Sequence, residues 1–225
     1  MKIATWNVNS LKVRLPHLLD WLAARQPDVV CLQETKLEDG KFPCDEIIAA
    51  GYQVVFAGQK TYNGVAILSK QPLLDVAAGM AGYDDLQQRV LAATINGTRV
   101  ICVYVPNGQS VDSDKYQYKL AWLNALTGLL GNELARYPKL IVLGDYNIAP
   151  DDRDVHDPAA WVGSPRGGGG GSDNLHVFLR REVMIWFIHD QPGANATLVM
   201  RHKLLVKPHH CLLREAARPW PRGRT

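Results

Sequence analysis

IATWN at residues 3–7 and VVCLQ at residues 29–33 are short apolar runs with the length and composition of buried β-strands. Between them, leucines recur at helical spacing from position 15 to position 22, and Gln26-Pro27 ends that pattern. The order strand, helix, strand predicts an α/β unit in which a sheet is covered by helices.

The chain continues this pattern to about residue 145. Asn96-Gly97 lies between two apolar runs and is a strong hairpin signal, so we expect antiparallel pairing as well. An amphipathic stretch over residues 116–136 predicts a long helix that leads into a buried strand at residues 140–143. Further strands are expected at residues 54–57, 65–68, 90–95 and 100–105. The expected fold class is therefore α/β, with layers around mixed sheets.

Composition places the chain among ordinary globular proteins. Its 225 residues, 47% of them hydrophobic, suffice for one sizeable core. No apolar run has membrane-spanning length and no signal sequence is visible, so we expect a cytoplasmic protein without membrane contact. The cysteines lie too far apart for a metal site and are expected to be reduced thiols: Cys31, Cys44, Cys102 and Cys211.

Charge divides the chain near residue 163. Residues 1–163 carry 15 Lys and Arg against 18 Asp and Glu, whereas residues 164–225 carry 10 against 4. The run of glycines at 167–171 is typical of a flexible linker. We therefore predict an enzyme-like part at residues 1–163, a Gly-rich linker at 164–172 and a basic, disordered tail at 173–225.

Acids and amides follow several of the expected strands. Asn7, Glu34, Asp145 and Asn147 lie at or just past strand ends, where loops converge and polar side chains escape burial. Carboxylate and amide oxygens with waters are ligands that Mg²⁺ or Mn²⁺ prefers. Singly, each residue has a structural explanation as a turn former, helix cap or Asx-turn. Together they indicate a metal-assisted phosphodiester site.

Seven motifs in order along the chain strengthen this interpretation. They are WNVNSL at 6–11, PDVV at 27–30, LQETK at 32–36, FP at 42–43, YNGVA at 62–66, YVPNG at 104–108 and GDYNIAP at 144–150. On these residues the chain, from Met1 to about Gly163, resembles the exonuclease III family of the DNase I-like endonuclease/exonuclease/phosphatase superfamily. The resemblance implies a four-layer sandwich around mixed β-sheets, whose second half is incomplete or replaced here.

The resemblance also implies roles for individual residues. Asn7 and Glu34 match positions that hold a divalent metal, Mg²⁺ or alternatively Mn²⁺, with Asp145 and Asn147 nearby. Tyr104 matches a phosphate contact, Asp145 the residue that orients the attacking water, and Asn147 a phosphate-binding amide. The positions expected to contact DNA are Lys36, Arg89 and Asn107. Structural alternatives remain open, because Tyr104 can be a strand-edge aromatic, and Lys36 and Arg89 can be ordinary surface cations.

The implied activities are those of a DNA repair nuclease. They are 3′ to 5′ removal of nucleotides from double-stranded DNA and incision beside abasic sites, by a protein expected to be monomeric. Two other functions stay open: a catalytically dead DNA-binding remnant, and a phosphatase or phosphodiesterase on the same scaffold.

One part of the family pattern is not found after Gly163. The family ends in Ser-Asp-His, which supplies a histidine and its carboxylate partner, whereas this chain offers only Ser172-Asp173-Asn174 and a reversed His189-Asp190. Either a basic segment has replaced the family's second half, or the reading frame slips near Ser164, which the excess of Gly, Arg and Pro favours. Impaired activity is expected in both cases.

Overall fold

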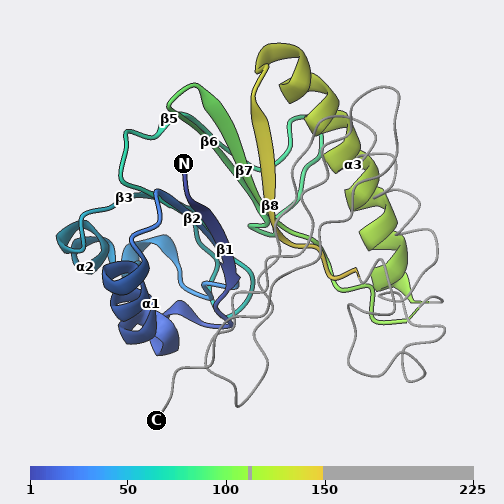
Figure 1. Cartoon of the computed structure of the whole chain (residues 1–225). Helices are drawn as coiled ribbons and strands as arrows, with labels where there is room; N and C mark the ends of the chain where they lie inside the picture. Colours follow the sequence, from blue (N-terminus) through green and yellow to red (C-terminus); the bar gives the residue numbers. More distant parts are fainter. Residues whose placement is uncertain (111–112, 149–225) are drawn as a thin grey trace, which may run out of the picture.

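The computed structural model describes residues 1–110 and 113–148, which form two four-stranded sheets and the helices that cover them. Figure 1 shows α1 and α2 on one side of the sheets and α3 on the other. The predicted linker and tail, the Ser172-Asp173-Asn174 and His189-Asp190 segments and Cys211 lie outside the described residues.

The first sheet has the strand order β1-β2-β4-β3. Its strands are β1 (Ile3–Asn7), β2 (Val29–Gln33), β3 (Gln53–Ala57) and β4 (Val65–Ser69). β1 and β2 are parallel because helix α1 (Leu11–Arg25) connects them, and β4 pairs antiparallel with both of its neighbours. Gln26 ends α1 in a left-handed conformation, with φ of 50°, at the position that the sequence predicted.

The second sheet has the order β5-β6-β7-β8. Its strands are β5 (Leu74–Ala78), β6 (Val90–Ile95), β7 (Thr98–Tyr104) and β8 (Leu140–Asp145). The Asn96-Gly97 turn joins β6 and β7, with φ of 49° and 71°, so both residues adopt the left-handed region that such hairpins require. Helix α3 (Asp114–Arg136) crosses back and makes β8 parallel to β7.

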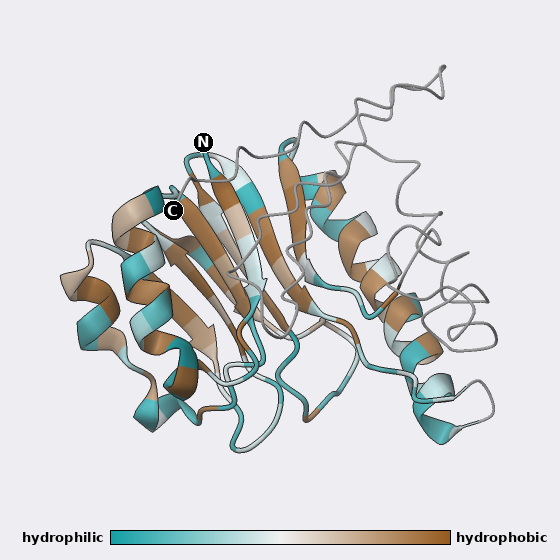
Figure 2. Ribbon diagram, turned by 60° about the horizontal axis from the view of Figure 1, so that its bottom comes forward, coloured by the Kyte–Doolittle hydropathy of each residue, from teal (hydrophilic) through white to brown (hydrophobic). Residues whose placement is uncertain are grey.

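Three apolar interfaces hold four layers together. Leu18 and Leu22 of α1 pack against the outer face of the first sheet, and Trp122 and Leu126 of α3 pack against the outer face of the second. Between the sheets lies a third cluster, which includes Val29, Ile67, Leu91, Cys102 and Leu143. The helices turn their apolar sides towards the strands (Figure 2). The predicted four-layer arrangement of helices about mixed sheets is confirmed.

Three elements were not predicted. They are β5, the short helix α2 (Cys44–Ala49) and the 3₁₀ turn η1 (Asp39–Lys41). β5 is an exposed edge strand, so no burial pattern marks it in the sequence, and the other two elements are too short to show a helical period.

The buried side of α3 is less apolar than the amphipathic pattern predicted. Leu120 and Leu134 are only partly buried, whereas Lys119 and Glu133 are almost fully buried. Glu133 pairs with Arg99 of β7, whose Nε lies 2.5 Å from Oε2. A buried ion pair therefore replaces part of the apolar contact between helix and sheet.

The described cysteines are free thiols, as expected: Cys31, Cys44 and Cys102. Cys31 and Cys102 lie between the two sheets, and burial raises the pKa of the Cys31 thiol. Among the described residues, no helix is long and apolar enough to cross a membrane.

Candidate functional site

The carboxyl ends of two parallel strand pairs meet at one edge of the sandwich. Asn7 ends β1, Glu34 follows β2, Tyr104 ends β7 and Asp145 ends β8. In the register of the second sheet, Tyr104 lies beside Asp145. Parallel strands present their carboxyl ends on the same side, so these four side chains converge although up to 138 positions separate them.

Asn7 links the two carboxylates of this cluster. Its Nδ2 donates to Glu34 Oε1 at 2.8 Å and to Asp145 Oδ2 at 2.7 Å. Its Oδ1 accepts the backbone N–H of Asn9 at 3.0 Å. One amide group therefore holds two acidic side chains, contributed by different sheets, next to each other.

Glu34 is the centre of the cluster. Its Oε1 also accepts the Tyr104 hydroxyl at 2.8 Å, and its Oε2 lies 2.9 Å from Lys36 Nζ. Burial raises the pKa of Glu34, but the hydrogen bonds from Asn7, Lys36 and Tyr104 together outweigh it, so the pKa lies below its ordinary value. Glu34 is therefore a carboxylate at neutral pH.

Tyr104 is the neutral donor of the cluster. Burial, and after it the negative charge of Glu34, raises the pKa of its phenol well above the ordinary value. The hydroxyl therefore stays protonated and available for donation.

Asn147 is held through its backbone as much as through its side chain. Its N–H donates to Asp145 Oδ1 at 2.9 Å, and its Nδ2 donates to the carbonyl of Val105 at 2.9 Å. Its own carbonyl accepts from Lys119 Nζ at 2.8 Å. Asn147 thus fixes the Asp145 carboxylate. Within residues 1–110 and 113–148, no group donates a hydrogen bond to its side-chain oxygen.

The remaining predicted residues lie in three different situations. Lys36 joins the cluster through Glu34 and through Asn9 Oδ1 at 2.5 Å. Arg89 is 9% exposed and lies behind Tyr104, with its guanidinium carbon 4.5 Å from the ring centroid. Asn107 is exposed, and its Oδ1 accepts the N–H of Gln109 rather than contacting the cluster. The description of Arg89 as an ordinary surface cation is therefore wrong.

The backbone around the cluster is strained. Asn9, Glu34, Lys36 and Asn147 have φ values between 44° and 54°, a region that residues with a Cβ seldom adopt. Gly144 allows β8 to approach β7, because a Cβ there would lie 1.8 Å from the carbonyl oxygen of Val103. Strain of this kind persists only where the surrounding structure imposes it, and it often accompanies function.

Two contributors were missed from the sequence. Asn9 holds Lys36 and Asn7, and Gln87 binds Arg89 Nε through its side-chain oxygen at 2.9 Å. Asn9 belongs to the WNVNSL motif, which was a usable signal. Nothing in the sequence marks Gln87.

The donor set fits a small divalent cation. Glu34 and Asp145 supply hard carboxylate oxygens, and Lys36 offsets only one of the two negative charges. Mg²⁺ commonly binds through one or two carboxylates and keeps several waters. Within residues 1–110 and 113–148, no group of three or more His, Cys, Asp or Glu side chains forms a denser metal cage.

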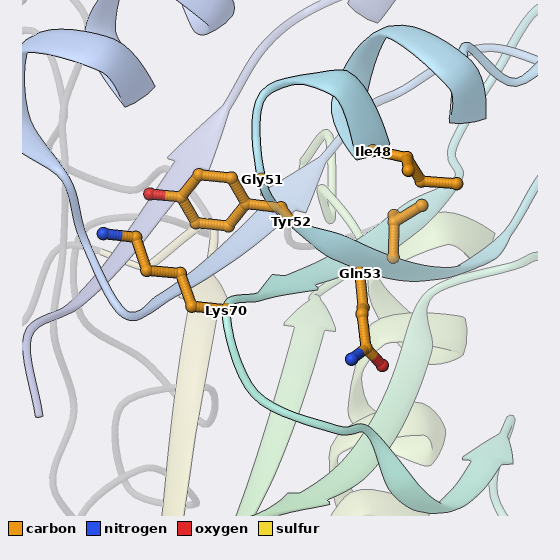
Figure 3. Close-up of a pocket in the computed structure, with 6 residues that line it drawn as sticks. Ile48, Gly51, Tyr52, Gln53 and Lys70 are labelled. Carbon is orange, nitrogen blue, oxygen red and sulfur yellow. The ribbon is translucent and has the colours of Figure 1, made fainter.

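A separate pocket lies at the edge of the first sheet (Figure 3). It is lined by Ile48, Gly51, Tyr52, Gln53, Val54 and Lys70. Tyr52 donates its hydroxyl to the carbonyl of Pro27, and Lys70 Nζ donates to Gln26 Oε1 at 2.6 Å. Both polar groups are therefore bonded to the turn after α1, and the pocket shares no residue with the Glu34 cluster.

Comparison with known sequences connects the chain to one family. Residues 4–204 match the model of the Endonuclease/Exonuclease/phosphatase family. The chain is 33% identical over 165 residues to an exodeoxyribonuclease of Bacillus subtilis and 34% identical over 162 residues to exodeoxyribonuclease III of Haemophilus influenzae. These alignments cover 71% and 69% of this chain, but only 64% and 60% of the relatives' length.

Solved structures give the same result. A 3′ phosphatase from Neisseria bound to a product DNA hairpin is 42% identical, with a TM-score of 0.79. An AP endonuclease from Archaeoglobus fulgidus is 35% identical, with a TM-score of 0.75. Each alignment covers 86% of this chain and 80% of the solved one.

Proposed function

Because the chain belongs to the endonuclease/exonuclease/phosphatase family, we propose that it is a divalent-metal-dependent DNA nuclease of the exonuclease III type. The observation that carries this proposal is the cluster of Glu34 and Asp145 around the amide of Asn7. Two carboxylates, an amide and a phenol at one sheet edge suit phosphodiester hydrolysis.

Glu34 and Asp145, assisted by the amides of Asn7 and Asn147, would hold Mg²⁺ or Mn²⁺. Such an ion, when bound, stabilises the negative charge that grows on the phosphoryl group. Tyr104 keeps its proton and donates to Glu34; with a substrate bound, the same hydroxyl would donate to a non-bridging phosphate oxygen. Asp145 would accept a hydrogen bond from the attacking water and orient it, and Asn147 keeps that carboxylate in place.

Double-stranded DNA, with or without an abasic site, is the proposed partner. The relatives described above include exodeoxyribonucleases, and one solved relative is bound to a DNA hairpin. Lys36 has a partly exposed side chain beside Glu34, where it would meet a phosphate of the bound DNA. Asn107, on an exposed loop, would contact DNA farther from the reacting phosphate.

Activity is proposed to be impaired, because Ser172-Asp173-Asn174 and His189-Asp190 do not reproduce the family's Ser-Asp-His motif. A general acid or base typically contributes about 10²- to 10⁴-fold in rate. We therefore expect hydrolysis to be slower than that of an intact relative by about this factor. DNA binding without any hydrolysis would instead favour the alternative, a catalytically dead DNA-binding remnant.

Hydrolysis of a 3′ phosphomonoester is a second candidate activity. The observation in its favour is the similarity, at 42% identity, to a 3′ phosphatase from Neisseria. Both activities would use the same cluster, so the choice of substrate distinguishes them.

Calorimetry and hydrolysis on the full chain test the proposal. We expect Mg²⁺ or Mn²⁺ to bind the wild type and Glu34→Gln to abolish both binding and cleavage of duplex, abasic and 3′-phosphate DNA. Glu46→Gln, at an exposed position on α2, is the matched control and should change neither. Equal metal binding by Glu34→Gln and wild type would remove Glu34 from the site.

A further inference from the structure

Arg89 is attached to Tyr104 by three contacts. Its guanidinium carbon lies 4.5 Å from the centroid of the Tyr104 ring, and its NH1 donates to the Tyr104 carbonyl at 3.1 Å. The backbone N–H of Tyr104 donates in turn to the carbonyl of Arg89 at 2.8 Å. Ring and backbone of Tyr104 are therefore both held by one residue.

Arg89 is itself held from outside the sheet. Its Nε donates to Gln87 Oε1 at 2.9 Å, and the backbone N–H of Gln87 donates to Asp85 Oδ1 at 2.9 Å. Asp85 Oδ2 accepts the hydroxyl of Tyr118 on α3 at 2.6 Å. The loop before β6 is thereby fixed to α3, which limits the positions that the guanidinium can take.

Within the part of the chain that the structure describes, Arg89 has no carboxylate partner. Among residues 1–110 and 113–148, the ion pairs within 4.0 Å involve other residues, although Arg89 is only 9% exposed. A buried cation without a carboxylate is costly, and an apolar side chain would serve packing better. Its guanidinium instead contacts the ring and the carbonyl of Tyr104 and the side chain of Gln87.

We propose that Arg89 is a positioning residue for Tyr104: it stacks on the ring and binds its carbonyl, so that the hydroxyl points to Glu34. Cation–π stacking fixes the plane of the Tyr104 ring, and the hydrogen bond to the Tyr104 carbonyl fixes the backbone from which the side chain extends. The consequence for catalysis rests on the proposed function, whereas the consequence for the ring does not. Arg89 thus acts through Tyr104 and not by direct contact with DNA.

Fluorine NMR of the full chain labelled with 3-fluorotyrosine tests the effect on the ring. The Tyr104 signal is identified by its loss in Tyr104→Phe. We expect Arg89→Met to move that signal towards that of Tyr62, which is 67% exposed, and Arg89→Lys to move it less. The paired substitution Arg99→Met with Glu133→Gln is the control, because it should move the Tyr137 signal and leave Tyr104 in place. A Tyr104 signal unmoved by Arg89→Met would overturn the proposal.

A double-mutant cycle of hydrolysis tests the consequence for catalysis. We expect Arg89→Met to lower kcat about tenfold with little change in KM, and to have no further effect in the Tyr104→Phe background. An equal loss in both backgrounds, or a rise in KM alone, would overturn action through Tyr104 and indicate direct DNA contact. If the wild type hydrolyses no substrate, the proposed function fails, while the NMR result still decides the role of Arg89.

Discussion

The two ends of the second sheet each contain an arginine buried against a tyrosine, yet they treat its charge differently. Arg99, at the start of β7, stacks 4.8 Å from the centroid of Tyr137 and pairs with the buried Glu133. Arg89, near the other end, stacks on Tyr104 and has a neutral glutamine on its Nε. One arginine is part of a closed ion pair, and the other is left without one in the described chain.

The carboxylates at the two ends also differ in how completely they are paired. Glu133 forms a buried ion pair with Arg99. Arg99 also donates to the carbonyl of Asp75 at 2.6 Å and so connects α3, β7 and β5. Glu34 and Asp145 are instead held by an amide, a phenol and a partly exposed lysine. A fully paired carboxylate has no charge left for a ligand and is costly to unpair, whereas a partly paired carboxylate keeps charge available for a ligand.

The largest effect is expected for Asp145→Asn, at the site end. The substitution keeps the shape of the side chain but removes the charge that would orient water, so hydrolysis should fall by about 10²- to 10⁴-fold. The melting temperature should fall slightly, because the new amide oxygen can still accept from the Asn147 N–H but its NH2 group would face the Asn7 amide donor. Asp20→Asn, exposed on α1, is the control and should keep full activity. Undiminished hydrolysis by Asp145→Asn would exclude its proposed role.

The opposite behaviour is expected for Glu133→Ala, at the other end. Loss of one partner of a buried ion pair typically costs about 3–5 kcal/mol, so the free energy of unfolding should fall by that amount. Chemical denaturation measures it, and metal affinity per folded molecule should stay unchanged. Arg136→Ala, which removes an exposed side chain 3.8 Å from Glu133, should cost less than about 1 kcal/mol. Equal costs for the two substitutions would contradict the distinction between the ends.

A smaller effect is expected for Lys36→Met. If Lys36 meets a phosphate, DNA affinity should fall and the slope of log K against log salt concentration should decrease by about 1. Lys41→Met is the control, because Lys41 is exposed and pairs with Glu38 away from the cluster. If Lys36→Met leaves the slope of log K against log salt concentration unchanged, Lys36 does not contact a phosphate and only pairs with Glu34.

The smallest effect concerns pH. The pKa of Glu34 is lowered in the folded state, so its ionised form stabilises the fold above the ordinary pKa of 4.5, and this contribution is lost as pH falls through the folded value. The difference in melting temperature between wild type and Glu34→Gln should therefore be constant near neutral pH and change only below about pH 4.5. A change centred near pH 7 would mean that burial, and not hydrogen bonding, dominates at Glu34.

Much of the fold was predictable because its strands are apolar and its turns have distinctive residues. β1 and β2 lie at the predicted bounds, and the Asn96-Gly97 hairpin forms as predicted. The edge strand β5 escaped prediction because all five of its residues are exposed. Hydrophobic periodicity in a sequence reflects which side chains are buried, so a strand with exposed side chains shows no such periodicity.

By itself, the sequence determined the order of the strands and helices and placed polar residues at strand ends, because hydrophobic period and turn chemistry act over a few neighbouring residues. Only the tertiary structure decided which of those residues meet. Asn7 reaches Asp145 because parallel pairing aligns the strand ends within each sheet and the packing of the two sheets brings those ends together. The burial of Arg89 against Tyr104 and of Glu133 against Arg99 was likewise decided by packing between elements, since charge in a sequence does not reveal whether its bearer faces water or another layer.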